Sequence, residues 1–128
     1  MRAVLACLTL VLPLTLSGCG RTLDAPTDRG VCWHLVTDNA GKPRFNRLAD
    51  SQPDLEHCAA QLEMMRLRFN GLGLARDKVT GAYQGQFLFI QREGVFTSQT
   101  YAGYRYPFMV RTGDGRLAIP GAMPRGPP

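Results

Sequence analysis

The sequence predicts an α+β domain in which one amphipathic helix packs on a small antiparallel sheet, a β-meander. Three observations support this expectation. Apolar residues recur at three- and four-residue steps between positions 55 and 69, as on one face of a helix. Runs rich in β-branched and aromatic residues flank that segment, and the runs after position 86 are separated by turns that contain glycine. Strands and a helix that occupy separate parts of a short chain are typical of the α+β class.

The first expected element is a strand over residues 31–36, which are rich in β-branched and aromatic side chains. Asp38-Asn39-Ala40-Gly41 follows and predicts a turn, because Asn and Gly tolerate the dihedral angles that turns require. Residues 44–48 are then expected to pair back as a second short strand.

The helix is expected to begin at residues 51–54. Ser51 can accept a hydrogen bond from the free N–H groups of the first turn, and Pro53 suits that turn. Asp54 and Glu56 complement the positive end of the helix dipole. Asn70-Gly71 is expected to end the helix. The apolar stripe consists of Leu55, Cys58, Leu62, Met65 and Phe69.

After a loop through Lys78, two hairpins are expected. Residues 86–91 and 95–100 flank the turn Arg92-Glu93-Gly94, and residues 104–111 and 116–119 flank the glycine-rich turn at 112–115. Residues 31–119 thus form a single domain. The Pro- and Gly-rich segment 120–128 is expected to be a disordered tail.

The expected strands are apolar on both faces. Phe87 and Phe89 point to one side of their strand, and Leu88 and Ile90 point to the other. One helix can cover only one face, and a bond through Cys58 would place it over the face that carries Cys32. The opposite face, which carries Trp33, is covered either by the chain itself or by another protein.

The N-terminal segment has the layout of a secretory signal. Arg2 is followed by an apolar run over residues 3–16. The run is shorter than the roughly 20 residues that a spanning helix needs. Pro13 would also interrupt a membrane helix.

Leu16-Ser17-Gly18-Cys19 resembles the lipobox of bacterial lipoproteins, in which the cysteine thiol is diacylated and the peptide is cut before it. The resemblance implies that residues 1–18 are a signal peptide, that Cys19 carries the lipid, and that the protein faces the periplasm on a stable anchor of several acyl chains. Residues 19–30 are then a tether. In some lipoproteins an Asp directly after the lipidated cysteine resembles a signal for retention in the inner membrane. This chain has Gly20 at that position, which favours the outer membrane as its location.

An exported protein is limited in its partners and in the state of its cysteines. The net charge is +5 for the chain and +4 without the segment that carries Arg2, with the basic residues scattered. Nucleic acid is not expected as a partner. Of the four cysteines, Cys32 and Cys58 remain for a disulfide, which persists in an oxidising compartment. Two free thiols are one alternative.

The other alternative is a metal site that adds His34 and His57 to these cysteines. Adjacent helical residues diverge by about 100°, so His57 and Cys58 can hardly both reach one ion. The spacing also matches no common zinc pattern. The disulfide is therefore favoured, and no metal or cofactor is expected.

The sequence contains no pattern that strongly indicates a catalytic site. Gly71-Leu72-Gly73 follows a helix rather than a strand, which does not fit a dinucleotide loop. Ser98 is the only serine left once Ser17 is removed and Ser51 caps the helix, and no spacing joins it to a histidine as in a catalytic triad. The chain is therefore not expected to be an enzyme, although an enzyme of unrecognised type stays open.

The leading interpretation is a lipid-anchored, non-enzymatic module that interacts with another envelope protein, similar to other small envelope lipoproteins. The alternative is a module that binds a small ligand or glycan, or an inhibitor of a foreign hydrolase. Tyr101 and its neighbouring tyrosines can stack on sugar rings, or they can belong to a half-buried strand. The candidate binding surface consists of Trp33, Phe87, Phe89, Tyr104, Arg105 and Tyr106.

Overall fold

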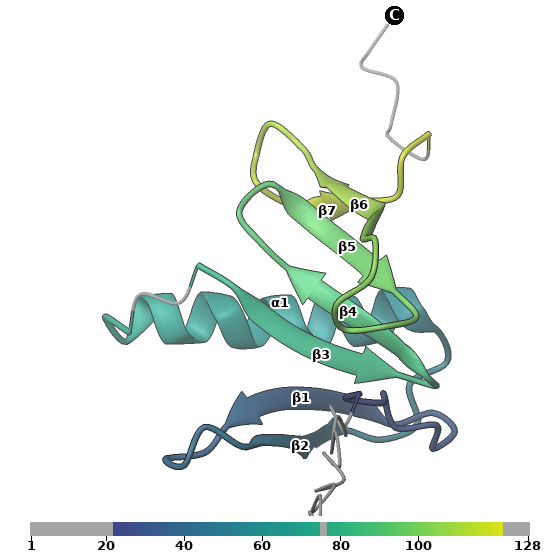
Figure 1. Ribbon diagram of the computed structural model, residues 1–128. Helices are drawn as coiled ribbons and strands as arrows, with labels where there is room; N and C mark the ends of the chain where they lie inside the picture. The colour runs from purple at the N-terminus through teal and green to yellow at the C-terminus, as the bar shows by residue number, and fades with distance from the viewer. Residues whose placement is uncertain (1–21, 75–76, 122–128) are drawn as a thin grey trace, which may run out of the picture.

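The computed structural model describes residues 22–74 and 77–121. These residues form one helix, α1 (Leu55–Gly71), and one antiparallel sheet with the strand order β2-β1-β3-β4-β5-β6-β7. The predicted α+β class, with one helix packed on a sheet, is confirmed (Figure 1). The strands are β1 (Cys32–Thr37), β2 (Pro43–Ala49), β3 (Val79–Tyr83), β4 (Gln86–Ile90), β5 (Gly94–Ser98), β6 (Tyr106–Arg111) and β7 (Leu117–Ala118).

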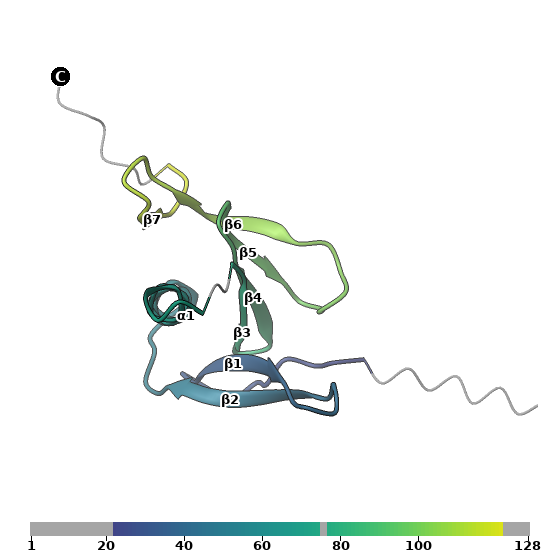
Figure 2. The same cartoon turned by 90° about the vertical axis from the view of Figure 1, so that its left-hand side faces the viewer.

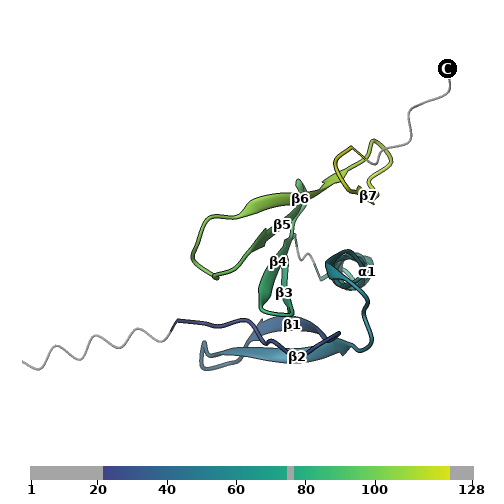
Figure 3. The ribbon, with the colours of Figure 1, turned by 90° about the vertical axis from the view of Figure 1, so that its right-hand side faces the viewer.

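The sheet curls around α1. Figures 2 and 3 look along the helix and show β1 and β2 beneath it, β3 and β4 beside it, and β6 and β7 above it. The loop between β5 and β6 projects on the side of the sheet away from α1 (Figure 2). The helix therefore lies in the concave side of the sheet, and the convex side faces that loop.

The helix begins later than predicted. Asp54, and not Ser51, is the N-cap residue, and its carboxylate accepts a 2.8 Å hydrogen bond from the N–H of His57. Ser51 has a φ of 53°, in the left-handed region, and lies in the connection from β2. That connection is held by a 2.8 Å hydrogen bond from the Gln52 N–H to the Gly30 carbonyl. The prediction that Ser51 caps the helix was wrong because this connection needs residues 50–53.

Strand β3 was missed by the sequence prediction. It pairs with β1 on one side and β4 on the other. Gln84 and Gly85 form the turn to β4 with φ values of 44° and 83°, as two-residue hairpin turns of the right twist require. Gly81 and Ala82 weaken the strand pattern in the sequence. The pair Gln84-Gly85 is the signal that could have identified the hairpin.

The core lies between α1 and the concave face of the sheet. Its buried members include Ala59, Leu62, Val79, Leu88, Ile90 and Val95. Gly81 permits the close approach of the helix, because a Cβ atom there would lie 2.5 Å from the Trp33 carbonyl oxygen and would overlap the side chain of Leu62. The absence of a side chain at Gly81 thus sets how near α1 lies to β3.

The predicted disulfide between Cys32 and Cys58 is confirmed. The two Cα atoms are 5.3 Å apart, within the range of roughly 4.4–6.8 Å that disulfides adopt. Both cysteines are fully buried. The bond fastens the start of β1 to the first turns of α1.

At β4, the convex face of the sheet is covered by the chain itself. Phe87 and Phe89 are buried there, with exposed fractions of 0% and 2%. The Tyr101 ring packs on both, at centroid distances of 5.7 Å and 6.1 Å. The Arg105 guanidinium lies 3.6 Å from the centroid of Phe89. Of the two alternatives for this part of the sheet, coverage by the chain is therefore the one found.

Residues 22–30 run as irregular chain along the β3–β4 turn. The Gly85 N–H donates to the Pro26 carbonyl at 2.8 Å, and the Gly30 N–H donates to the Gln84 side chain at 2.9 Å. The part of the expected tether nearest the domain is thus hydrogen-bonded to it. Residues 1–18, Cys19 and most of the expected tail lie outside the described residues.

Candidate functional site

The described surface carries hollows beside the helix, at an end of the sheet and at the start of the helix. The last of these is the smallest of the three, with a volume of about 300 Å3, and is lined by Pro53, Asp54, Leu55, Tyr83, Gln84 and Gln86. The first, here called the helix groove, lies between α1 and the β6–β7 hairpin and has a volume of about 690 Å3. Its apolar lining consists of Ala60, Met64, Leu67, Met109 and Leu117. Met64 and Leu67 are 53% and 54% exposed. The groove therefore presents a half-exposed apolar strip to its surroundings.

A buried ion network forms the wall of the helix groove. The Glu63 carboxylate receives two hydrogen bonds from Arg66, at 2.8 Å and 3.0 Å. It receives two more from Arg111, at 2.6 Å and 3.1 Å. Glu63 and Arg66 are only 8% and 7% exposed. Paired hydrogen bonds of this kind fix the orientation of both groups, so the wall is rigid.

Arg111 extends the network to two turns. It also donates to the carbonyl oxygens of Gln91 at 2.7 Å, Arg92 at 2.8 Å and Gly115 at 3.1 Å. One side chain thus joins α1, the β4–β5 turn and the β6–β7 turn. These contacts hold the rim of the groove in place.

The network also sets the charge of Glu63. Burial raises the pKa of this carboxyl, but the hydrogen bonds from Arg66 and Arg111 outweigh burial and leave the pKa below its ordinary value. The hydrogen bond to Glu63 raises the pKa of Arg66. Glu63 is therefore ionised near neutral pH, and the three groups together carry one positive charge.

The rim of the groove adds further positive charge. Arg92 and Arg116 line it together with Asp114. The Asp114 carboxylate lies 3.3 Å from Nε of Arg116. The hydrogen bond from the Thr112 hydroxyl lowers the pKa of Asp114. Arg92 forms no ion pair with any other residue of the described chain. Arg92 can therefore meet an anionic group of a ligand.

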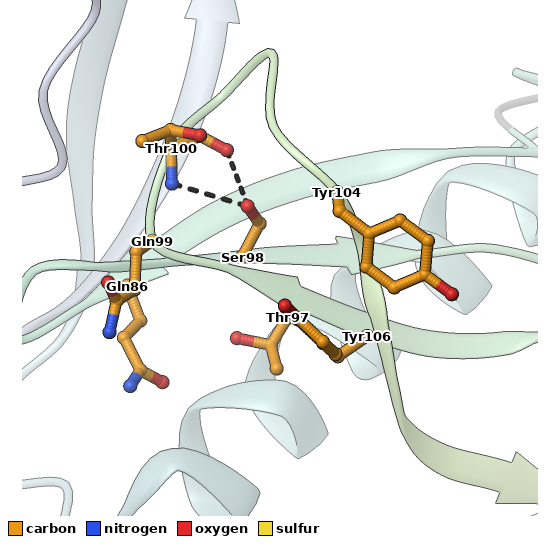
Figure 4. Close-up of a pocket in the computed structure, with 7 residues that line it drawn as sticks. All are labelled: Gln86, Thr97, Ser98, Gln99, Thr100, Tyr104 and Tyr106. Atoms are coloured by element: carbon orange, nitrogen blue, oxygen red, sulfur yellow. Dashed lines mark hydrogen bonds between the residues drawn. The ribbon is translucent and has the colours of Figure 1, made fainter.

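The second hollow, here called the tyrosine pocket, lies where β4 begins, β5 ends and β6 begins (Figure 4). Its volume is about 510 Å3. Tyr104 and Tyr106 are 73% and 60% exposed, and their rings meet edge to face with centroids 4.8 Å apart. The lining residues are Gln86, Thr97, Ser98, Gln99, Thr100, Tyr104 and Tyr106, and none of these carries a charge.

Internal hydrogen bonds shape the tyrosine pocket. The Ser98 hydroxyl donates to the Thr100 carbonyl at 2.7 Å and accepts from the Thr100 N–H at 3.2 Å (Figure 4). The Thr97 hydroxyl donates to the Phe87 carbonyl at 2.9 Å. These two hydroxyls are therefore used in hydrogen bonds within the protein, whereas the glutamine amides and the tyrosine rings remain accessible to a ligand.

The structure separates the residues of the predicted binding surface. Tyr104 and Tyr106 come together in the tyrosine pocket. Arg105 turns away from it and covers Phe89, which is buried together with Phe87. These two phenylalanines therefore contribute no exposed surface.

Trp33 lies apart from that group, on β1. It is half-buried, and the Arg47 guanidinium lies 5.2 Å from the centroid of its ring. Its indole N–H is buried and has no hydrogen-bond partner among the described residues. Trp33 is thus a half-buried residue whose ring lies beside Arg47, away from the helix groove and the tyrosine pocket.

Sequence reasoning missed the helix groove and half of the tyrosine pocket. The Met64-Met65 pair fits core filling by type, but Met64 is exposed and only Met65 packs against the core. Gln86 and Gln99 join one pocket only because β4 and β5 are adjacent in the sheet. The exposed spacing of Ala60, Met64 and Leu67, at four- and three-residue steps, is the signal that could have revealed the groove.

The alternative metal site is not assembled. Cys32 and Cys58 are bonded to each other. The exposed His57 ring lies 2.6 Å from the Asp54 carboxylate, whereas His34 is buried and faces Phe69. Across residues 22–74 and 77–121, no group of three or more His, Cys, Asp or Glu side chains is placed to hold a metal ion.

Within the described chain, no helix has the length and apolar character needed to cross a membrane. Comparison with known proteins finds no matching family model, no similar curated protein and no similar solved structure. Function must therefore be inferred from the surfaces of the chain itself.

Proposed function

We propose that this chain is a lipid-anchored protein of the bacterial cell envelope whose domain is a non-enzymatic interaction module. The anchor is Cys19, in a segment that resembles a lipobox, and the domain faces the periplasm. The disulfide between Cys32 and Cys58 fits this location, because structural disulfides persist in oxidising compartments. The proposed binding surface is the helix groove, and the proposed occupant is a segment of another envelope protein.

The half-exposed apolar strip of the groove is the observation that carries the interaction proposal. Ala60, Met64 and Leu67 lie on one side of α1, beside the β6–β7 hairpin. Burial of a half-exposed Met or Leu side chain contributes on the order of 1 kcal/mol to binding. Met64 can also adjust its shape to a partner, because its side chain is unbranched and flexible.

The positive charge of the groove favours an occupant with acidic side chains. Arg66, Arg92, Arg111 and Arg116 line the groove against only two acids, Glu63 and Asp114. The net charge of its lining is therefore positive. An amphipathic helix with an apolar stripe and acidic flanks complements both the strip and the rim, in the manner of helix-in-groove recognition.

Binding rather than catalysis is the role we propose for the helix groove and the tyrosine pocket. The Ser98 hydroxyl is bound to Thr100, and the exposed histidine, His57, is bound to Asp54 outside both hollows. A nucleophile paired with a base, which acyl transfer requires, is not found among the lining residues.

Photo-crosslinking in bacterial cells that express the full chain tests this function. A benzophenone amino acid replaces Leu67 in the groove or, as a control, Gln99 in the tyrosine pocket. We expect Leu67 to crosslink to one protein, through a segment that sequencing shows to be apolar and acidic, and we expect Gln99 not to crosslink to it.

A matched pair of charge reversals sharpens this test. Arg92→Glu should reduce the Leu67 crosslink several-fold, because it places a negative charge at the rim of the groove. Arg44→Glu makes the same charge change on β2, away from the groove, and should leave the yield unchanged. Equal yields in the two variants, or adducts with lipid alone, would contradict the proposed occupant.

A further inference from the structure

We propose a second binding site: the tyrosine pocket binds a neutral oligosaccharide. This site lies outside the helix groove, shares no lining residue with it and does not depend on the proposed protein partner. The inference rests on the aromatic surface of the pocket, its accessible amide groups, and its lack of charge.

The aromatic surface comes from Tyr104 and Tyr106. Their rings meet at 72° with centroids 4.8 Å apart, so the edge of one ring contacts a face of the other. That contact covers only one of the four ring faces, and both side chains are largely exposed. A tyrosine ring joins a flat apolar face to a polar tip. It can therefore pack on the C–H face of a pyranose and donate a hydrogen bond to a sugar hydroxyl.

The amide groups come from Gln86 and Gln99. Figure 4 shows the two glutamines on one side of Ser98 and Tyr104 on the other. Neither glutamine side chain forms a hydrogen bond within the described chain. Each amide offers donors and an acceptor, which are the groups that sugar hydroxyls and acetamido groups require. A ligand that spans the pocket can thus meet amides at one end and an aromatic ring at the other.

The charge of the pocket excludes an anionic preference. None of the seven lining residues is charged. Arg105 lies between the two tyrosines in sequence, but its guanidinium is held 3.6 Å from the Phe89 ring centroid. A phosphate or carboxylate would find no cation in the lining, so the class of ligand is a neutral glycan.

The pocket is formed before any ligand binds. The bonds between Ser98 and Thr100, and the packing of Tyr101 on Phe87, hold the loop that leads from β5 to β6. A pre-formed site avoids the cost of ordering a loop on binding. Its volume of about 510 Å3 also lies within the roughly 300–1,000 Å3 typical of small-ligand sites.

The test is saturation-transfer NMR on the full chain in detergent micelles, with neutral trisaccharides as probes. Chitotriose, cellotriose and maltotriose are compared with the acidic trimer of galacturonic acid. We expect transfer to the ring C–H protons of at least one neutral trisaccharide, and weaker transfer to the acidic trimer. Binding of the acidic trimer alone, or of none of the four, would overturn the proposal.

Variants assign the binding to the pocket. Tyr104→Ala and Tyr106→Ala should each weaken binding by roughly fivefold or more, because each removes a stacking face. Tyr104→Phe keeps that face and should retain most of the affinity, which separates stacking from loss of fold. Leu72→Ala, at an exposed position outside the helix groove and the tyrosine pocket, is the control and should bind as the unaltered chain does. Unchanged affinity in both alanine variants would place any binding elsewhere and overturn the site.

Discussion

The guanidinium of Arg111 and the carboxylate of Glu63 meet through two hydrogen bonds, at 2.6 Å and 3.1 Å, across 48 residues of sequence. This contact joins the last long strand of the sheet to the middle of the helix. Because Arg66 bonds to the same carboxylate, Glu63 offsets part of the positive charge of two arginines that line the helix groove. Glu63 therefore helps to set both the shape and the charge of the proposed docking surface, beside Asp114 at its rim.

Replacement of Glu63 should destabilise the domain. Glu63→Gln removes the charge that compensates the buried Arg66 and the largely buried Arg111. Loss of one partner of a buried ion pair costs about 3–5 kcal/mol. Urea denaturation should show this loss, and Glu93→Gln, in the exposed β4–β5 turn, should leave the midpoint nearly unchanged. A midpoint equal to that of the unaltered chain would contradict a structural role for the network.

The same carboxyl should make stability depend on acid pH. The folded-state pKa of Glu63 is lowered, so the unfolded chain binds the proton more tightly than the folded chain does. Its contribution is present above the unfolded pKa, about 4.3, and is lost as the pH falls through the lower folded value. Unfolding midpoints measured from pH 7 to pH 3 should fall, and the fall should be shallower in Glu63→Gln. Parallel curves for the two proteins would contradict this assignment.

The disulfide should contribute a large part of the stability. Cys32 and Cys58 are separated by 26 positions, and closing a loop of that size contributes about 3–4 kcal/mol in the chain-entropy model. Cys58→Ala should therefore lower the melting temperature markedly. Reduction of the unaltered chain should lower it to a similar extent, whereas the reductant should not affect the variant. Free thiols in natively extracted protein would contradict the bond.

Close packing of α1 on β3 should be sensitive to one added methyl group. Gly81→Ala places a Cβ atom against Leu62 and the Trp33 carbonyl oxygen, and overpacking of this kind costs about 1–3 kcal/mol. Gly113→Ala is the matched control, because a Cβ atom there would meet nothing within 4 Å. Equal melting temperatures for the two variants would show that the helix can shift away from β3 at little cost.

Local patterns predicted most of the elements. The apolar spacing from Leu55 to Phe69 predicted α1, and the β-branched and aromatic runs predicted β1, β4, β5 and β6. The disulfide could be predicted because two cysteines remained for one bond. Strand β3 was missed because Gly81, which leaves room for Leu62 of the helix, and Ala82 carry almost no strand signal.

The binding surfaces could be predicted only in part. Tyr104 and Tyr106 are neighbours in sequence and were identified as candidates, whereas Gln86 reaches them only through the pairing of β4 with β5. The exposure of Met64 depends on how the sheet curls around α1, and the burial of Phe87 and Phe89 depends on where Tyr101 folds back. These are tertiary relationships, which short-range periodicity does not encode.

Location in the envelope underlies the proposed function, and mass spectrometry of the mature N-terminus tests it most directly. The full chain is expressed in bacteria, extracted from membranes with detergent and digested. We predict an N-terminal peptide that begins at Cys19 and carries the mass of its acyl chains, and we predict that Cys19→Ser accumulates as uncut precursor. An N-terminal peptide that begins elsewhere, or a Cys19 without acyl groups, would contradict the lipid anchor.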